Sequence, residues 1–149
     1  MEMHGERRIP APRDEVWAKL NDAETLKNCI PGCQELEKTS DTEFTAKVRA
    51  KVGPVSATFT GKVALTDLDP PNGYTISGEG QGGVAGFAKG GAKVSLDQDG
   101  ADTVLHYGVQ AQVGGKLSQI GSRLIDATAR KMADDFFNKF VAAVSADGS

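Results

Sequence analysis

Three glycines in the middle of the chain have the spacing of a dinucleotide-binding motif. Gly78, Gly80 and Gly83 match the pattern G-x-G-x-x-G, in which glycines let the backbone approach a pyrophosphate. In such sites a helix begins at the motif, and its N-terminus holds the phosphate. Here residues 84–91 read Val-Ala-Gly-Phe-Ala-Lys-Gly-Gly, which is typical of a strand or a loop. The motif lacks its structural context, so we do not predict nucleotide binding.

Imidazole and thiol groups are few, and their positions do not indicate a catalytic centre. His4 lies near the N-terminus and His106 on the polar side of a predicted strand, so a Ser-His-Asp arrangement is not supported. Cys29 and Cys33 lack the second pair, or the histidines, of a zinc site. We interpret them as reduced thiols in a tight turn, with metal or redox chemistry as the alternative. We predict no catalytic residue, no metal and no cofactor, and therefore no enzyme.

The amino-acid composition limits the kinds of partner that the protein could bind. The 149 residues carry 17 Lys+Arg against 20 Asp+Glu, a net charge of −3, and show no basic stripe that would neutralise phosphates. This balance argues against nucleic-acid binding. The N-terminus is too polar for a secretory signal, and no run approaches the ~20 apolar residues of a membrane span. We expect a cytoplasmic protein.

The hydrophobic pattern predicts short helices, then many strands. Residues 2–9 are expected to form a first strand, with short helices at about 14–21 and 23–28. From Cys33 onwards apolar residues recur at every second position, which is typical of strands. The strands for which we assign an apolar side cover residues 44–52, 55–65, 74–80, 87–97 and 105–113.

Residues 114–144 have a helical period instead. Intervals of three and four place one apolar stripe on a single face, which predicts an amphipathic helix of about 28 residues, roughly 42 Å long. The larger side chains lie in the second half, which we expect to be core, and the smaller ones in the first half, which we expect to face a ligand. The stripe comprises Leu117, Ile120, Gly121, Leu124, Thr128, Met132, Phe136, Phe140 and Val144.

These elements predict an α+β fold in one domain, residues 1–149. A curved antiparallel sheet of about seven strands would wrap around the long C-terminal helix, with two short helices after the first strand. This is the helix-grip arrangement.

The predicted inward face of the sheet is rich in alanine and glycine. A curved sheet cannot meet a straight helix closely along its whole length, so small residues there predict an apolar cavity. The alternative is that Leu124, Met132 and Phe136 fill the gap. The residues that we expect to bind a ligand are Phe59, Gly61, Ile76, Gly78, Phe87, Tyr107, Val109, Leu117, Ile120, Gly121, Leu124 and Thr128.

Two features of this predicted cavity carry specific expectations. Residues 82–87 read as a mobile loop in which Val84 and Phe87 could gate the cavity mouth. Tyr107 is the one side chain with a polar tip that we place inside; it is either structural or a hydrogen-bond donor to a ligand carbonyl.

Several motifs resemble those of the family of the carbon monoxide dehydrogenase G subunit. They are Cys-Ile-Pro-Gly-Cys at residues 29–33, Gly-Lys-Val at 61–63, Ser-Gly-Glu-Gly at 77–80 and Val-Gly-Gly-Lys-Leu-Ser-Gln-Ile-Gly-Ser-Arg-Leu-Ile-Asp at 113–126. The resemblance covers about residues 1–143 and implies membership of the larger superfamily of START-like (SRPBCC) helix-grip proteins. It implies an accessory protein encoded beside molybdenum-containing hydroxylases, without catalytic residues of its own.

The resemblance and the cavity lead to one leading hypothesis and two alternatives. The leading hypothesis is a non-catalytic accessory protein of a molybdenum hydroxylase that carries an apolar, lipid-like ligand such as a quinone. The first alternative is a docking or maturation factor that recruits the hydroxylase to the membrane. The second is a cyclase or hydrolase of the same superfamily. Some relatives have a long tail suited to membrane attachment, whereas this chain ends at Ser149. We expect at most peripheral contact with the inner face of the membrane.

Overall fold

The computed structural model describes residues 1–148 of the chain, and the side chains of residues 1–144. Seven strands, three α-helices and two short 3-10 helices (η) follow one another along these residues. In chain order they are β1 (Glu2–Ile9), α1 (Arg13–Leu20), α2 (Ala23–Cys29), β2 (Cys33–Ser40), β3 (Glu43–Val52), β4 (Val55–Asp69), β5 (Gly73–Gln81), η1 (Gly83–Ala85), β6 (Phe87–Asp99), β7 (Asp102–Gly114), η2 (Gly115–Gln119) and α3 (Ser122–Gly148).

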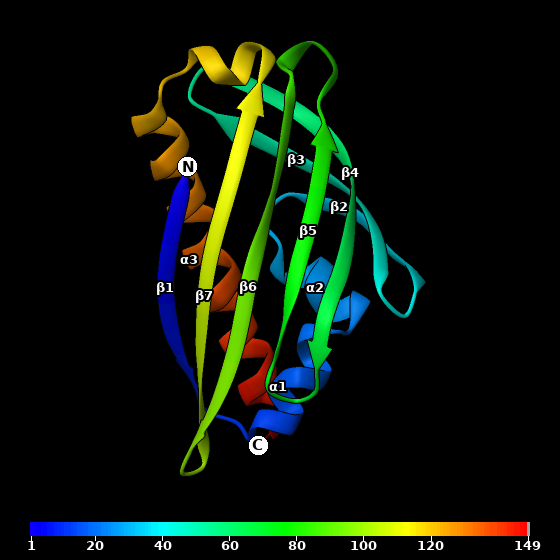
Figure 1. Ribbon diagram of the computed structural model, residues 1–149, viewed down its shortest axis with the longest axis vertical. Coiled ribbons are helices and arrows are strands. Elements are labelled where there is room, and N and C mark those ends of the chain that lie inside the picture. Colours follow the sequence, from blue (N-terminus) through cyan, green and yellow to red (C-terminus); the bar gives the residue numbers. More distant parts are fainter. Residues whose placement is uncertain (149) are drawn as a thin grey trace.

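The strands form a single antiparallel sheet in the order β1-β7-β6-β5-β4-β3-β2. Strands β2 to β7 pair in chain order. Strand β1 pairs with β7, so β1 and β2 are the two edge strands. The sheet curves around α3, and α1 and α2 lie beside the C-terminal half of that helix (Figure 1). This arrangement confirms the predicted helix-grip fold.

Strand register determines which residues share a face. Leu65 pairs with Ile76, Ile76 with Ala92, Ala92 with Val109, and Val109 with Met3. Side chains at paired positions lie on the same side of a sheet, so this apolar row runs across five strands. We call the side toward α3 the inner face and the opposite side the outer face.

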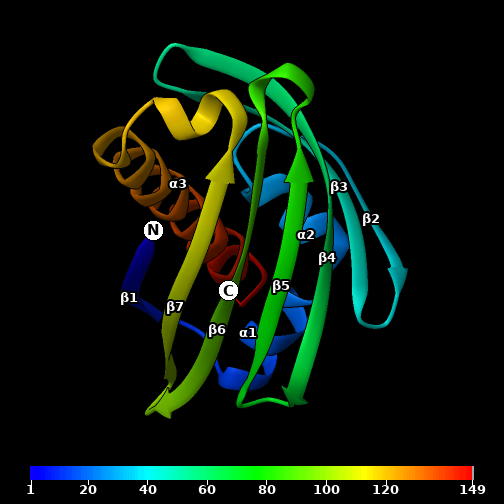
Figure 2. The same ribbon diagram turned by 45° about the horizontal axis from the view of Figure 1, so that its top comes forward.

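The densely packed core occupies one end of the space between sheet and helix. Val16 of α1 and Phe140 of α3 are fully buried against Ile9, Leu96 and Leu105 of the sheet. We call this the core end. The opposite end consists of the β3–β4 turn, η1, η2 and the first turn of α3, and we call it the loop end (Figures 1 and 2).

The long helix begins later than the apolar stripe predicted. Residues 115–119 form η2, and α3 starts at Ser122. Gly115 and Gly121 have φ angles of 70° and 101°, a region that is costly for residues other than glycine and incompatible with an α-helix. The prediction of one continuous helix from residue 114 is therefore wrong, because two glycines break it.

Asp22 caps the short helix α2, and this contact predicts a dependence of stability on pH. One carboxylate oxygen accepts hydrogen bonds from the Thr25 amide (3.1 Å) and hydroxyl (2.6 Å), which lower the pKa of Asp22. A lowered folded-state pKa adds stability above the ordinary pKa of aspartate, about 3.9, which is lost as pH falls through the folded value. We expect Asp22→Ala to lower the free energy of unfolding by about 1 kcal/mol at pH 7.

Chemical denaturation of both proteins at pH 7 and at about pH 2.5 measures this effect. The difference in free energy of unfolding between the parent and Asp22→Ala should shrink at the lower pH. The reason is that protonated Asp22 no longer accepts both hydrogen bonds as a carboxylate. Glu24→Ala, in the same helical turn but without a capping contact, serves as the control. A difference that is the same at both pH values would contradict the role of the ionised cap.

Candidate functional site

Apolar side chains of the inner face differ in burial between the two ends. At the core end Leu65, Leu96 and Leu105 are at most 7 % exposed, and Phe140 and Val144 of α3 cover them. Toward the loop end the apolar side chains on the inner face are only half-buried. They are Val48, Val52, Val55, Phe59, Ile76, Val109 and Val113 of the sheet, together with Ile125 and Met132 of α3.

Two glycines of β5 mark where the inner face lacks a packed neighbour. A side-chain carbon placed at Gly78 would meet only the Lys62 carbonyl oxygen and Val63 Cγ2, both at 3.5 Å and both from β4. At Gly80 the corresponding contact is Phe59 Cβ at 3.7 Å. No atom of α3 comes within 4 Å of either position, whereas protein interiors are normally close-packed.

Other glycines of the sheet have a different role. A side-chain carbon at Gly61 would lie 2.6 Å from the Glu79 carbonyl oxygen, and one at Gly90 would lie 2.1 Å from that of Gln110. Both glycines therefore permit close approach of neighbouring strands. The prediction that Gly61 leaves volume for a ligand is corrected accordingly, because backbone atoms of β5 already occupy that space.

A small hollow of about 230 Å³ lies between β3 and α3. Ala50 and Lys51 of β3, Thr128 and Met132 of α3, and the Pro31–Gly32 turn contribute to its wall. Of the predicted ligand residues, Thr128 is the one that lines it. Ala50 and Met132 are not among the predicted ligand residues, although both belong to the apolar pattern of their elements.

Leu117 is buried at the loop end. The 3-10 helices η1 and η2 contact each other there, and Ala85 and Leu117 are each 3 % exposed. Gly86 and Gly115 make the contact close, since a side-chain carbon at Gly86 would lie 1.9 Å from the Gly114 carbonyl oxygen. Leu117 thus packs with η1 rather than on the face of a long helix.

The two phenylalanines of the predicted site lie on opposite faces of the sheet. Phe59 pairs with Val48 on the inner face, and its ring lies beside Gly82. Phe87 pairs with Gln81 and Gly114, positions on the outer face, and its ring covers Gly114. The prediction that Phe87 gates the inner cavity is therefore wrong, because the alternation along β6 places its side chain on the other side.

Ile120, Gly121 and Leu124 form the junction between η2 and α3. A side-chain carbon at Gly53 would lie 3.3 Å from both Ile120 Cγ2 and Leu124 Cδ1, so the β3–β4 turn packs on this junction. Leu124 remains 46 % exposed. Figure 2 shows the β3–β4 hairpin reaching over the start of α3. This contact joins the sheet to the helix at the loop end.

Tyr107 and Arg7 lie between β1, β7 and the second half of α3. The Tyr107 ring stacks on Phe137 at 5.1 Å between centroids and covers Gly5. Arg7 forms an ion pair with Asp134 and lies 5.6 Å from the centre of the Phe137 ring. Arg7 is thus a charged residue on the inner face. The sequence prediction does not assign residues 2–9 to faces, although the apolar Met3 and Ile9 lie an even number of positions from Arg7 and therefore share its face.

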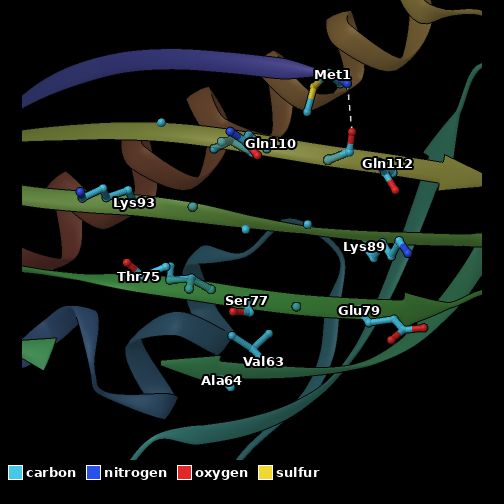
Figure 3. A pocket seen from close by; sticks show the side chains of 18 of the residues that line it. Met1, Val63, Ala64, Thr75, Ser77, Glu79, Lys89, Lys93, Gln110 and Gln112 are labelled. Carbon is cyan, nitrogen blue, oxygen red and sulfur yellow. Dashed lines mark hydrogen bonds between the residues drawn. The ribbon is translucent and has the colours of Figure 1, made fainter. Parts of the chain in front are cut away.

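A second, larger hollow lies on the outer face, across β1, β7, β6, β5 and β4. Its volume is about 1070 Å³, and no α3 residue lines it. Figure 3 shows Lys93, Lys89, Glu79, Gln110 and Gln112 around it, and Met1, whose N-terminal ammonium group donates to the Ala111 carbonyl at 2.9 Å. The small residues Ala64, Ser77, Gly91 and Gly108 form its floor. Side chains of both charge signs lie around this hollow, whereas the inner face is apolar.

The thiol and imidazole groups of the chain do not form a reactive cluster in the described residues. Cys29 is buried and Cys33 half-buried, both are unpaired thiols, and burial raises the pKa of each. His106 lies on the outer face between Glu6 (3.3 Å) and Asp97 (3.2 Å). Within the described residues, no three His, Cys, Asp or Glu side chains gather as a metal site would require.

The fold, with its incompletely covered inner face, can be compared with known families. The sequence model of the family described as the G subunit of carbon monoxide dehydrogenase (CoxG) matches residues 5–145. The chain belongs to this family. A comparison with curated protein sequences gives no significant match. Membership of the CoxG family agrees with the resemblance that the sequence motifs at residues 29–33, 61–63, 77–80 and 113–126 indicated.

Solved structures similar to this CoxG-family chain support the fold assignment. A conserved protein from Geobacillus kaustophilus has 29 % identity and a TM-score of 0.91, covering 97 % of this chain and 95 % of its own. A protein from Thermus thermophilus has 16 % identity and a TM-score of 0.73, with full coverage of both chains. The Zhui aromatase/cyclase from Streptomyces sp. R1128 has 15 % identity and a TM-score of 0.65, covering 97 % and 93 %.

Membrane-spanning helices would need both length and apolar character. Among the residues that the structure describes, no helix combines the two to the degree needed to cross a bilayer.

Proposed function

We propose that this CoxG-family chain is a non-catalytic accessory protein that binds an apolar ligand between the inner face of the sheet and the first half of α3. The observation that carries the proposal is the incomplete covering of that face. Phe59, Val109 and Val113 are half-buried there, and nothing from α3 lies within 4 Å of a side-chain carbon at Gly78. An apolar ligand would supply the missing dispersion contacts and remove this surface from water.

The character of the wall favours binding over catalysis. Within the described strands β3 to β7, the inner-face positions carry no acidic, basic or histidine side chain. General acid–base or nucleophilic catalysis needs such groups at the reacting atoms. Arg7, on the inner face of β1, already pairs with Asp134. The cyclase or hydrolase alternative therefore receives no support from these residues.

We propose a quinone as the ligand and a molybdenum hydroxylase of the carbon monoxide dehydrogenase type as the partner. The family name motivates the partner. A quinone is flat and apolar with two carbonyl acceptors, and the hydroxyl group of Thr128, in the wall of the hollow between β3 and α3, is a suitable donor. Comparing quinone reduction by the hydroxylase with and without this chain tests the accessory role. An unchanged rate would contradict it.

Gly78→Leu is the variant that tests the ligand site. Space at Gly78 allows a side chain, so the variant should fold, and leucine should occupy ligand volume and weaken binding of a short-chain ubiquinone at least about tenfold. Native mass spectrometry and quinone titration measure binding, and thermal melts measure stability. Ser77→Leu, the neighbouring outer-face position, is the matched control and should bind normally.

A different result would show that the inner face is filled. In a close-packed core the same leucine overpacks, which typically costs about 1 to 3 kcal/mol. Unchanged quinone binding combined with a large drop in melting temperature for Gly78→Leu would therefore refute the ligand site.

A further inference from the structure

The loop end carries basic residues, although the chain as a whole is acidic. Three segments contain no Asp or Glu at all: residues 44–66, 80–96 and 103–125. They supply the β3–β4 turn, η1, η2 and the first residues of α3. The exposed basic residues at or next to these turns are Arg49, Lys51, Lys116 and Arg123. A protein of net charge −3 thus has one end whose turns bear only positive charge.

Acidic residues gather at the opposite end. Asp69 lies in the β4–β5 turn, and Asp97, Asp99 and Asp102 lie in or beside the β6–β7 turn. These turns lie at the lower end of the molecule in Figure 1, whereas η1, η2 and the β3–β4 turn lie at the upper end. Arg8 pairs with Asp99 and Asp102 at the lower end, whereas the turns of the loop end carry basic residues without acidic ones.

The four basic residues are not neutralised within the protein. Among the described residues, Arg49, Lys51, Lys116 and Arg123 form no ion pair, whereas Arg7 and Arg8 each have a carboxylate partner. The Arg49 guanidinium donates to the hydroxyls of Thr58 and Ser56, which are uncharged. Unpaired charges at one end give that end a positive potential, which attracts an anionic surface.

Two exposed apolar side chains lie at the same end as these charges. Val84, in η1, is 86 % exposed, and Leu124, in the first turn of α3, is 46 % exposed. They are brought to the same end because η1 contacts η2 and the β3–β4 turn packs beside Leu124. A single exposed apolar residue is ordinary, but exposed apolar residues and unpaired cations at the same end are typical of surfaces that lie in a lipid interface.

We propose that the loop end docks onto an anionic lipid surface. Arg49, Lys51, Lys116 and Arg123 would contact acidic headgroups, and Val84 would enter the boundary between headgroups and acyl chains. An acidic protein surface is the less favoured partner, because Val84 and Leu124 do not form the continuous apolar centre of a stable protein interface. Binding of this kind is reversible and weakens with added salt.

Flotation with lipid vesicles tests the docking surface. Ligand-free protein is mixed with vesicles of phosphatidylglycerol and phosphatidylcholine, or of phosphatidylcholine alone, at low salt and at about 0.5 M salt. We expect binding to the anionic vesicles at low salt and loss of binding in the other conditions. The double variant Lys116→Glu/Arg123→Glu should reduce binding at least about tenfold, and Val84→Ser should reduce it severalfold.

Two control variants separate this surface from general charge and hydrophobicity. Lys93→Glu changes an exposed lysine of β6, and Leu68→Ser changes an apolar side chain that is 41 % exposed near the other end of β4. Both should bind like the parent. The proposal is overturned if anionic vesicles are not bound, if neutral vesicles bind equally, or if the controls lose as much binding as the loop-end variants. Because the assay contains no quinone, these outcomes are independent of the proposed ligand site.

Discussion

Replacing Phe140 by alanine is expected to lower the free energy of unfolding by about 3 to 5 kcal/mol, the usual cost of truncating a buried aromatic side chain. Phe140 is 0 % exposed, stacks on Phe136 at 5.7 Å between ring centroids, and belongs to the same core cluster as Val16. Removing its ring leaves a cavity among side chains from both sheet and helices. Chemical denaturation, followed by the fluorescence of Trp17, measures the loss.

Leu124→Ala provides the comparison on the same helix. Leu124 is 46 % exposed, and its Cδ1 lies beside Gly53 of the β3–β4 turn, so we expect a loss below about 1 kcal/mol. This contrast tests the predicted division of α3 into a core half and a half that faces a ligand. Equal losses for Phe140→Ala and Leu124→Ala would show that the division is wrong.

Gly86→Ala should disrupt the contact between η1 and η2. Gly86 has φ of 109° and ψ of −149°, a region that is essentially restricted to glycine. A side-chain carbon there would also lie 1.9 Å from the Gly114 carbonyl oxygen, a backbone atom that cannot move by rotating a side chain. We expect a loss of at least about 2 kcal/mol and faster amide hydrogen exchange at Ala85 and Leu117.

Gly83→Ala, in the same turn, separates backbone conformation from steric conflict. Gly83 has φ of 62°, but nothing lies within 4 Å of a side-chain carbon at that position. Its replacement should therefore cost about 1 kcal/mol, from conformation alone. If the two variants were equally destabilised, the close contact of Gly86 with Gly114 would not contribute to the stability of the loop end.

Periodicity in the sequence was sufficient to determine the fold. Alternation of apolar and polar residues predicted the strands and their inward sides, and register pairs such as Leu65–Ile76 and Ala92–Val109 confirm it. A shift of one residue would expose every apolar side chain of a strand, so the pattern allows only one orientation. The spacing of Phe136, Phe140 and Val144 likewise predicted the half of α3 that packs in the core.

Glycines limited what the same pattern could predict about the site. The stripe from Leu117 to Thr128 fits a helix by spacing alone, but positive φ angles at Gly115 and Gly121 divide it into η2 and α3. Spacing counts residues and carries no information about the backbone angles that glycine permits. Leu117 consequently packs on η1, and the first half of α3 presents fewer side chains to the sheet than we predicted.

Contacts between distant segments decided the remaining features of the site. Phe87 lies on the outer face, as its pairing with Gln81 and Gly114 shows, because Ala88 and Gly90 of the same strand face inward. Arg7 reaches Asp134 across 127 positions of the chain. The sequence alone thus determined which residues are apolar and with what period, whereas the tertiary structure decided which of them are covered, because burial depends on what the rest of the fold brings against each side chain.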